Sequence, residues 1–132
     1  MTAEIISVGT ELLLGNILNT NAQYLSRELA ALGITVQRES TIGDNHSRLA
    51  DFVNEAKQRC DLLVFTGGLG PTADDLTKET IAEAAGVELV LHEESRQRIE
   101  TYFKGRYCGK PIQTGHAAQG VHGLPNDAGT RR

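Results

Sequence analysis

The sequence predicts an α/β domain with a mainly parallel sheet that is covered by helices on both faces. Strand-like and helix-like segments alternate three times in succession along the chain. Residues 62–65 form a short, continuous apolar run, which is typical of a parallel strand buried on both faces. A glycine-rich turn then joins this run to a helical segment. Successive strand–helix–strand units of this kind fold as right-handed crossovers, which gives the predicted architecture.

The first predicted strand and helix lie within the first third of the chain. Residues 4–8 are predicted to form a strand, and residues 9–19 a loop. Residues 20–32 follow with apolar side chains on one helical face, and Gly33 supplies the C-terminal stop. The apolar positions of this face are Ala22, Leu25, Leu29 and Leu32.

The second strand is predicted to begin at Ile34 and to end near Ser40. Asp44 or Asn45 then caps a helix whose apolar residues have helical spacing. These residues are Leu49, Phe52, Val53 and Ala56. The third strand, over residues 62–65, comes next.

A third helix is predicted over residues 74–85, with Gly86 as its stop and Thr72 and Asp75 as a capping pair at its start. Residues 87–91 form a short strand or an extended connection, and residues 93–104 form a fourth helix. From Gly105 onward, glycines recur and the apolar periodicity is lost, which indicates loop or a poorly ordered tail. We therefore divide the chain into a domain over residues 1–112 and a glycine-rich tail over residues 113–132.

Composition excludes several classes of protein. The chain has 132 residues, enough for one domain, and its net charge is −4 without a basic stripe, so nucleic acid is not an expected partner. Its two cysteines, Cys60 and Cys108, are far apart and form no metal-binding or redox pair. The apolar runs are too short to cross a membrane, and because residues 1–4 lack a basic region we expect no signal peptide. We expect a cytoplasmic protein that does not bind membranes.

The glycine-rich turn over residues 66–77 is the first candidate site. Gly67, Gly68 and Gly70 permit positive φ angles and remove side chains, so backbone N–H groups can face an anion. The spacing matches neither a P-loop nor the dinucleotide-binding fingerprint. Judged by its glycines alone, the turn suits a structural connector as well as a ligand-binding loop.

The hydroxyl and carboxylate groups of this turn favour a ligand. Asp74 and Asp75 stand with Thr66, Thr72 and Thr77, which is more oxygen than helix capping requires. Ions such as Mg²⁺ bind carboxylate oxygens together with phosphates. The alternative is that the two acids only complement the helix dipole. The turn thus predicts a site for a phosphate or a metal-bound phosphate.

Two further loops should meet this turn, because parallel strands present their carboxyl ends at one edge of the sheet. Asn19 and Asn21 are either helix caps or ligand contacts. Glu11 is a rim carboxylate for a ribose hydroxyl or a metal, or else a structural acid. Asp44 is either a helix cap or, with Asp75, a holder of a divalent ion that polarises phosphate and activates water.

Residues 7–15, 19–22, 42–44 and 61–79 carry a family resemblance. They resemble the N-terminal domain of the competence/damage-inducible CinA family, which belongs to the molybdopterin-binding superfamily. The likeness covers roughly residues 3–108, and its most specific part is the block Thr-Gly-Gly-Leu-Gly-Pro-Thr-x-Asp-Asp-Leu-Thr. It implies a three-layer α/β sandwich, a metal-dependent ADP-ribose pyrophosphatase, and homo-oligomers, either dimers or trimers.

From the residues and the resemblance together, we predict a divalent-metal-dependent hydrolase that splits the pyrophosphate of ADP-ribose or a related nucleotide. Asp44 and Asp75 are the predicted catalytic residues, and the predicted metal ligands are Asp44, Asp74 and Asp75. The predicted substrate contacts are Glu11, Asn19, Thr66, Gly67, Gly68, Gly70, Thr72 and Thr77.

Two alternatives remain open at this stage. The domain is a binding module for a pterin or nucleotide phosphate without turnover, as in other members of the superfamily, or a purely structural oligomerisation domain. The chain also departs from the family pattern, since residues 113–123 form a shortened stretch, and we expect 132 residues to be too few to include the C-terminal amidohydrolase domain that many family members carry. These departures bear on turnover more than on fold.

Overall fold

Three parallel strands form the centre of the domain. The structure is a computed structural model, and it describes residues 1–70, 75–102 and 116–118. Strands β1 (Thr2–Val8), β2 (Thr35–Ile42) and β3 (Leu62–Thr66) lie in the order β2-β1-β3, and both neighbours pair with β1 in parallel. Every residue of β1 after Thr2 is buried. The parallel α/β architecture predicted from the sequence is confirmed.

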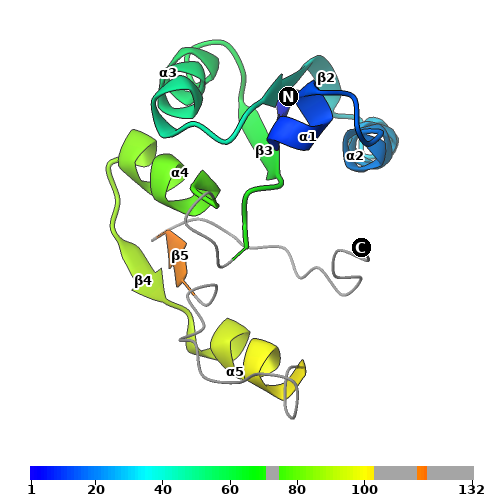
Figure 1. The fold of residues 1–132 in the computed structure, drawn as a ribbon. Coiled ribbons are helices and arrows are strands. Elements are labelled where there is room, and N and C mark those ends of the chain that lie inside the picture. Colours follow the sequence, from blue (N-terminus) through cyan, green and yellow to red (C-terminus); the bar gives the residue numbers. More distant parts are fainter. Residues whose placement is uncertain (71–74, 103–115, 119–132) are drawn as a thin grey trace.

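Helices cover both faces of this sheet, which makes three layers (Figure 1). Helix α2 (Thr20–Ala31) packs on the face that carries Ala3 and Ile5. Helices α3 (His46–Ala56) and α4 (Thr77–Ala85) lie on the face that carries Ile6. Ile5 and Ile6 are both 0% exposed, and burial of one such side chain stabilises a fold by about 1.5–3 kcal/mol.

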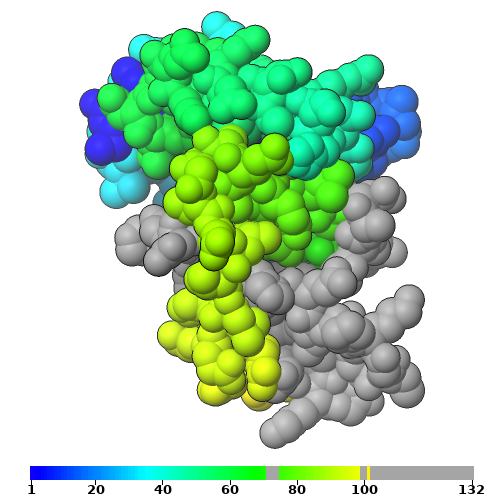
Figure 2. Space-filling model, turned by 90° about the vertical axis from the view of Figure 1, so that its left-hand side faces the viewer, coloured from blue at the N-terminus to red at the C-terminus, as the bar shows by residue number. Residues whose placement is uncertain are grey.

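Helices α3 and α4 lie side by side (Figure 2). The ammonium group of Lys57, at the end of α3, donates to the carbonyl oxygen of Ala84 at 2.6 Å. At the other end of α3, His46 Nε2 lies 2.8 Å from a carboxylate oxygen of Glu83. Both contacts join α3 to α4, the helix that follows the glycine-rich turn.

Several element boundaries differ from the sequence prediction. β2 continues to Ile42, because Val8 of β1 supplies a partner for it there. A short helix, α1 (Thr10–Leu13), occupies part of the segment predicted to be loop. α2 ends at Ala31, so Leu32 is 75% exposed and does not belong to the apolar face on which we placed it.

The predicted start of α4 is wrong. The helix begins at Thr77 rather than near residue 74, and Leu76 occupies its N-cap position without a side-chain capping bond. Asp75 therefore precedes the helix instead of capping it, and Thr72 lies outside the described residues. The predicted stop is confirmed, since Gly86 is left-handed with a φ of 68°.

A second, smaller sheet lies beside α4, away from the main sheet (Figure 1). β4 (Leu89–Leu91) pairs antiparallel with β5 (His116–Ala118), and α5 (Glu93–Tyr102) follows β4. The prediction of loop after Gly105 is therefore wrong at β5, whereas residues 103–115 and 119–132 lie outside the described part. Among the helices that the structure describes, none is long and apolar enough to cross a membrane.

Candidate functional site

The three loops predicted to converge all leave the same edge of the main sheet. Ser7 of β1 lies opposite Thr41 of β2 on one side and Thr66 of β3 on the other. The loops that follow begin within one or two residues of this row. We call them together the carboxyl-end rim, which comprises residues 9–19, 43–45, 67–70 and 75–76.

The first two loops of the rim are joined by a reciprocal pair of hydrogen bonds. The Thr10 N–H donates to Asp44 Oδ2 at 2.8 Å, and the Asp44 N–H donates to Thr10 Oγ1 at 3.1 Å. The Gly9 N–H also donates to the carbonyl oxygen of Ile42 at 2.9 Å. These bonds hold the predicted catalytic residue Asp44 against the end of β1.

Asp44 does not cap α3, which was one of the two roles left open for it. Asn45 takes that role, since its side-chain oxygen accepts the Arg48 N–H at 3.0 Å. In the exposed carboxylate of Asp44, Oδ2 accepts the hydrogen bond from Thr10, and Oδ1 accepts no hydrogen bond among the described residues. One oxygen of Asp44 is thus fixed and the other is available to a ligand.

The first turn of α2 is tied to all three strands. Asn19 caps α2 by accepting the Ala22 N–H at 3.2 Å, so its capping role is confirmed. Its amide nitrogen also donates to Ser7 Oγ at 2.9 Å and to Glu39 Oε1 at 3.2 Å. Next along the helix, Asn21 donates to Thr66 Oγ1 at 3.2 Å. The Thr66 hydroxyl therefore already has a protein partner.

The glycine-rich turn has the left-handed backbone that the sequence predicted, with φ values of 88° at Gly67 and 60° at Gly68. A Cβ atom at Gly67 would collide with the carbonyl oxygen of Val8, and one at Gly68 with the hydroxyl of Thr77. Both glycines are therefore required by packing as well as by conformation.

Thr77 holds this turn from below. Its side chain is fully buried, its hydroxyl donates to the Gly67 carbonyl oxygen at 3.0 Å, and its N–H donates to the Gly68 carbonyl oxygen at 3.2 Å. We predicted Thr77 as a substrate contact, and the structure places it beneath the turn rather than on its outer surface.

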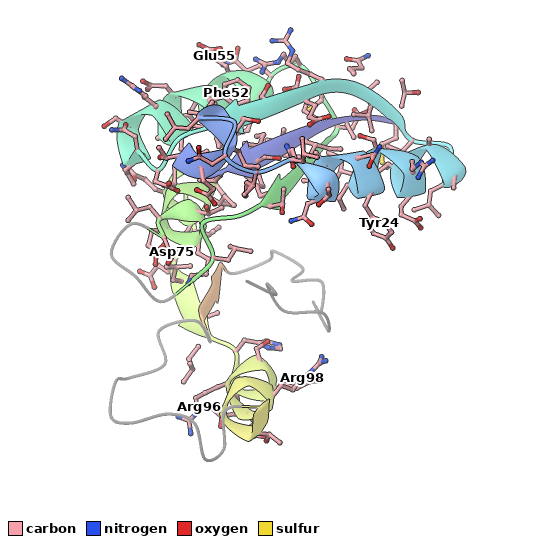
Figure 3. All side chains as sticks on the ribbon, turned by 45° about the vertical axis from the view of Figure 1, so that its right-hand side comes forward. Tyr24, Phe52, Glu55, Asp75, Arg96 and Arg98 are labelled. Carbon is pink, nitrogen blue, oxygen red and sulfur yellow. The ribbon has the colours of Figure 1, made fainter. Side chains whose placement is uncertain are left out.

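The remaining predicted acids lie around this turn. A Cβ atom at Gly70 would come within 2.5 Å of an Asp75 carboxylate oxygen, so the half-buried Asp75 packs against the turn. Figure 3 shows Asp75 beside the start of α4. Glu11 is exposed on α1, and its carboxylate folds back over Gly9. Asp74, like Thr72, lies outside the described residues.

Within residues 1–70, 75–102 and 116–118, no three His, Cys, Asp or Glu side chains gather closely enough to hold a metal ion. Mg²⁺ commonly uses only one or two protein carboxylates, with waters and substrate phosphates completing its six oxygen ligands. The open oxygen of Asp44 fits that kind of site. The predicted divalent metal stays a prediction.

Sequence reasoning missed three residues that shape the rim. Ser7 and Glu39 bind the Asn19 amide, and Thr10 binds Asp44. Ser7 carries a usable signal, because it is a hydroxyl residue between the apolar residues Ile6 and Val8 in the buried part of β1. The signal at Thr10 is weaker. Each of the first two strands is followed by a glycine and then a polar residue, Gly-Thr after the first strand and Gly-Asp after the second.

The parallel core and the left-handed glycine turn at its carboxyl end define a class, namely the α/β domains that take ligands at the ends of their strands. Within that class, the chain belongs to the family described as the probable molybdopterin-binding domain, which matches residues 4–128.

Relatives extend this assignment. The chain is 55% identical over 135 residues to a putative competence-damage inducible protein of Alkaliphilus oremlandii, covering 98% of this chain and 32% of the relative. It is 53% identical over 133 residues to a CinA-like protein of Dictyoglomus thermophilum, with the same coverage of both chains. The predicted resemblance to the CinA family is confirmed. The chain spans about a third of the length of these relatives.

Solved structures agree with this family. The protein CinA of unknown function from Thermoplasma acidophilum superposes with a TM-score of 0.81 at 28% identity, covering 98% of this chain and 77% of the other. The tungsten cofactor synthesizing protein MoaB of Pyrococcus furiosus has a TM-score of 0.62 at 24% identity, over 76% of this chain and 63% of its own. The second likeness supports the fold alone.

Proposed function

We propose that this domain binds a small molecule that carries phosphate, a nucleotide or a pterin, with the phosphate at the turn formed by residues 67–70. The observation that carries this proposal is that backbone N–H groups of the turn lack a hydrogen-bond acceptor in the described part of the protein. Among the described residues, the N–H groups of Gly67, Gly68 and Gly70 donate to no carbonyl or side chain, while the carbonyls of Gly67 and Gly68 are held by Thr77. Successive amides in such a turn form a concave site for anions.

The acids of the rim favour a divalent cation beside that phosphate. Glu11, Asp44 and Asp75 bring carboxylates to the rim from three separate segments, after β1, after β2 and before α4. Mg²⁺ commonly takes one or two protein carboxylates together with phosphate oxygens and waters, so one of these acids would be enough.

Hydrolysis of a nucleotide pyrophosphate, such as that of ADP-ribose, is the second candidate function. It is favoured by the orientation of Asp44, whose Oδ2 is fixed by Thr10 while Oδ1 faces no protein donor in the described residues. Such an oxygen suits a metal ligand or an acceptor for the proton of an attacking water. Water would add to one phosphorus as the bridging oxygen leaves, which gives AMP and ribose 5-phosphate from ADP-ribose.

Titration calorimetry with ADP-ribose, in Mg²⁺ and in a chelator, tests binding, and chromatography of the products tests turnover. We expect metal-dependent binding in the wild-type protein. Gly68→Ala should weaken it at least tenfold, because the new Cβ meets Thr77 beneath the turn.

Gly33→Ala is the matched control for this test. Gly33 is also left-handed, with a φ of 74°, but a Cβ there meets nothing within 4 Å. Both variants therefore carry a similar conformational cost of about 1–2 kcal/mol. Equal affinity in both, or no binding of ADP-ribose or a pterin phosphate by the wild type, would contradict the proposal. Binding without products would leave the domain a binding module.

A further inference from the structure

We propose that Thr10 is a positioning residue, which orients the Asp44 carboxylate toward the ligand of the carboxyl-end rim. This inference rests on the role that the proposed function gives to Asp44. It adds a residue outside the glycine-rich turn, contributed by the start of α1 directly after β1.

The geometry restrains Asp44 at two points. The Thr10 hydroxyl accepts the backbone N–H of Asp44 at 3.1 Å, and the Thr10 N–H binds Asp44 Oδ2 at 2.8 Å. One bond sets where the residue's backbone lies, and the other sets the direction of its carboxylate. A single bond would leave the carboxylate free to swing about that contact.

The surrounding contacts leave this pair little freedom. Gly43 lies so close that a Cβ atom there would be 3.3 Å from Thr10 Oγ1 and 3.1 Å from a methyl group of Leu13. The bond from Gly9 to Ile42 fixes the preceding residues of both loops. Since Asn45 caps α3, the helix does not need Asp44 for its own start.

Thr10→Val tests the proposal, because it preserves the shape of the side chain, removes the acceptor for the Asp44 N–H and keeps the N–H that binds Asp44 Oδ2. It therefore asks whether the hydroxyl must hold the backbone of Asp44 in place for that N–H to orient the carboxylate. Thr10→Ser, which restores the hydroxyl, is the rescue variant. Thr35→Val is the matched control, since Thr35 is exposed at the start of β2 and its hydroxyl has no partner among the described residues. Each variant is assayed for kcat and KM with ADP-ribose, for Mn²⁺ affinity by electron paramagnetic resonance, and for Tm.

We expect Thr10→Val to lower kcat on the order of 10- to 100-fold, with KM changed less than about twofold. Mn²⁺ affinity should fall, Tm should match that of Thr35→Val within a few degrees, and Thr10→Ser should recover most of kcat. In an Asp44→Asn background, Thr10→Val should cause no further loss, because residues that act as a unit are not additive.

Two failures are distinguishable. If Asp44→Asn loses activity and Mn²⁺ affinity while Thr10→Val keeps both, the positioning role is overturned and the proposed function stands. If Asp44→Asn has the same Mn²⁺ affinity and the same rate of ADP-ribose hydrolysis as the wild type, Asp44 does not have the proposed role. The positioning role of Thr10 is then overturned as well.

Discussion

Arg59 donates two hydrogen bonds to the buried carboxylate of Glu4, from Nε to Oε1 at 2.6 Å and from Nη2 to Oε2 at 2.9 Å. Glu4 lies in the central strand β1 and is only 2% exposed. The guanidinium group also lies 5.4 Å from the centre of the Phe52 ring. The hydrogen bonds to Glu4 raise the pKa of Arg59 above its ordinary value. This ion pair ties the segment after α3 to the middle of the sheet.

Replacing Arg59 should destabilise the fold strongly. In Arg59→Met the Glu4 carboxylate stays buried without a partner, which costs on the order of 3 kcal/mol in the free energy of unfolding. Urea denaturation measures the loss. The control is Arg27→Met on the exposed surface of α2, which should be nearly neutral. A similar stability for the two variants would refute the prediction, and adding Glu4→Gln to Arg59→Met should restore part of the loss.

Asp61 should make stability depend on pH in acid. Its carboxylate accepts the Thr2 N–H at 2.7 Å and the Thr2 hydroxyl at 3.2 Å, and these bonds lower the pKa of Asp61. Because the folded-state pKa lies below the unfolded value of about 3.9, the stabilisation is present above that pH and is lost as pH falls through the folded value.

The urea midpoint of Asp61→Asn should therefore lie below that of the wild type at pH 7, and the gap should narrow as the pH falls below the unfolded-state value of about 3.9. Asp51→Asn, on the exposed side of α3, serves as the control and should show no such gap. A gap that is constant across this pH range would mean that the charge of Asp61 is not what stabilises the strand start.

Thr77→Val should weaken both the fold and the phosphate site. The variant leaves the carbonyl of the half-buried Gly67 without its donor, which costs on the order of 1 kcal/mol, and it frees the turn to move. Thr80→Val is a close control, because Thr80 is equally buried and its hydroxyl donates to the Leu76 carbonyl in the same helix.

Calorimetry and urea denaturation of both variants separate the two effects. Both should be less stable than the wild type, and only Thr77→Val should lose affinity for the phosphate ligand, by about tenfold or more. An equal affinity loss in Thr80→Val would mean that general loosening of α4, rather than the turn, controls binding.

Asp75→Asn should keep the fold and lower hydrolysis at least tenfold, because the amide matches the carboxylate in shape but not in charge. The rate of product release from ADP-ribose measures the effect. Glu79→Gln, exposed in the first turn of α4, removes the same charge nearby and should retain the rate. Full activity in Asp75→Asn would remove Asp75 from the catalytic centre.

The architecture could be read from the sequence because local periodicity specifies it. Alternating strands and helices predict parallel pairing, and parallel pairing predicts that the loops meet at one edge. The predicted start of α4 is wrong for a reason that lies in the local sequence. The spacing of Thr72 and Asp75 imitates a capping pair, whereas Thr77 is the residue that ties the helix to the turn.

The long-range polar contacts, at the site and in the core, could not be predicted because their partners are far apart in sequence. Thr10 and Asp44 are separated by 34 residues, and Glu4 and Arg59 by 55. The role of Asp44 was also ambiguous, since either it or its neighbour Asn45 has the chemistry of a cap. The register decided between them, because the pairing of Val8 with Ile42 brings Asp44 beside Thr10.

The strand order β2-β1-β3 also determines when each strand finds its partner during synthesis on the ribosome. β1 is synthesised first, yet its second edge stays bare until Leu62 emerges to pair with Ala3. During that interval, Ile5 and Ile6 lie in a strand that is open to any other extended chain. A pause in translation before residue 62 would therefore expose the nascent chain to misassembly, and completion of β3 ends that hazard.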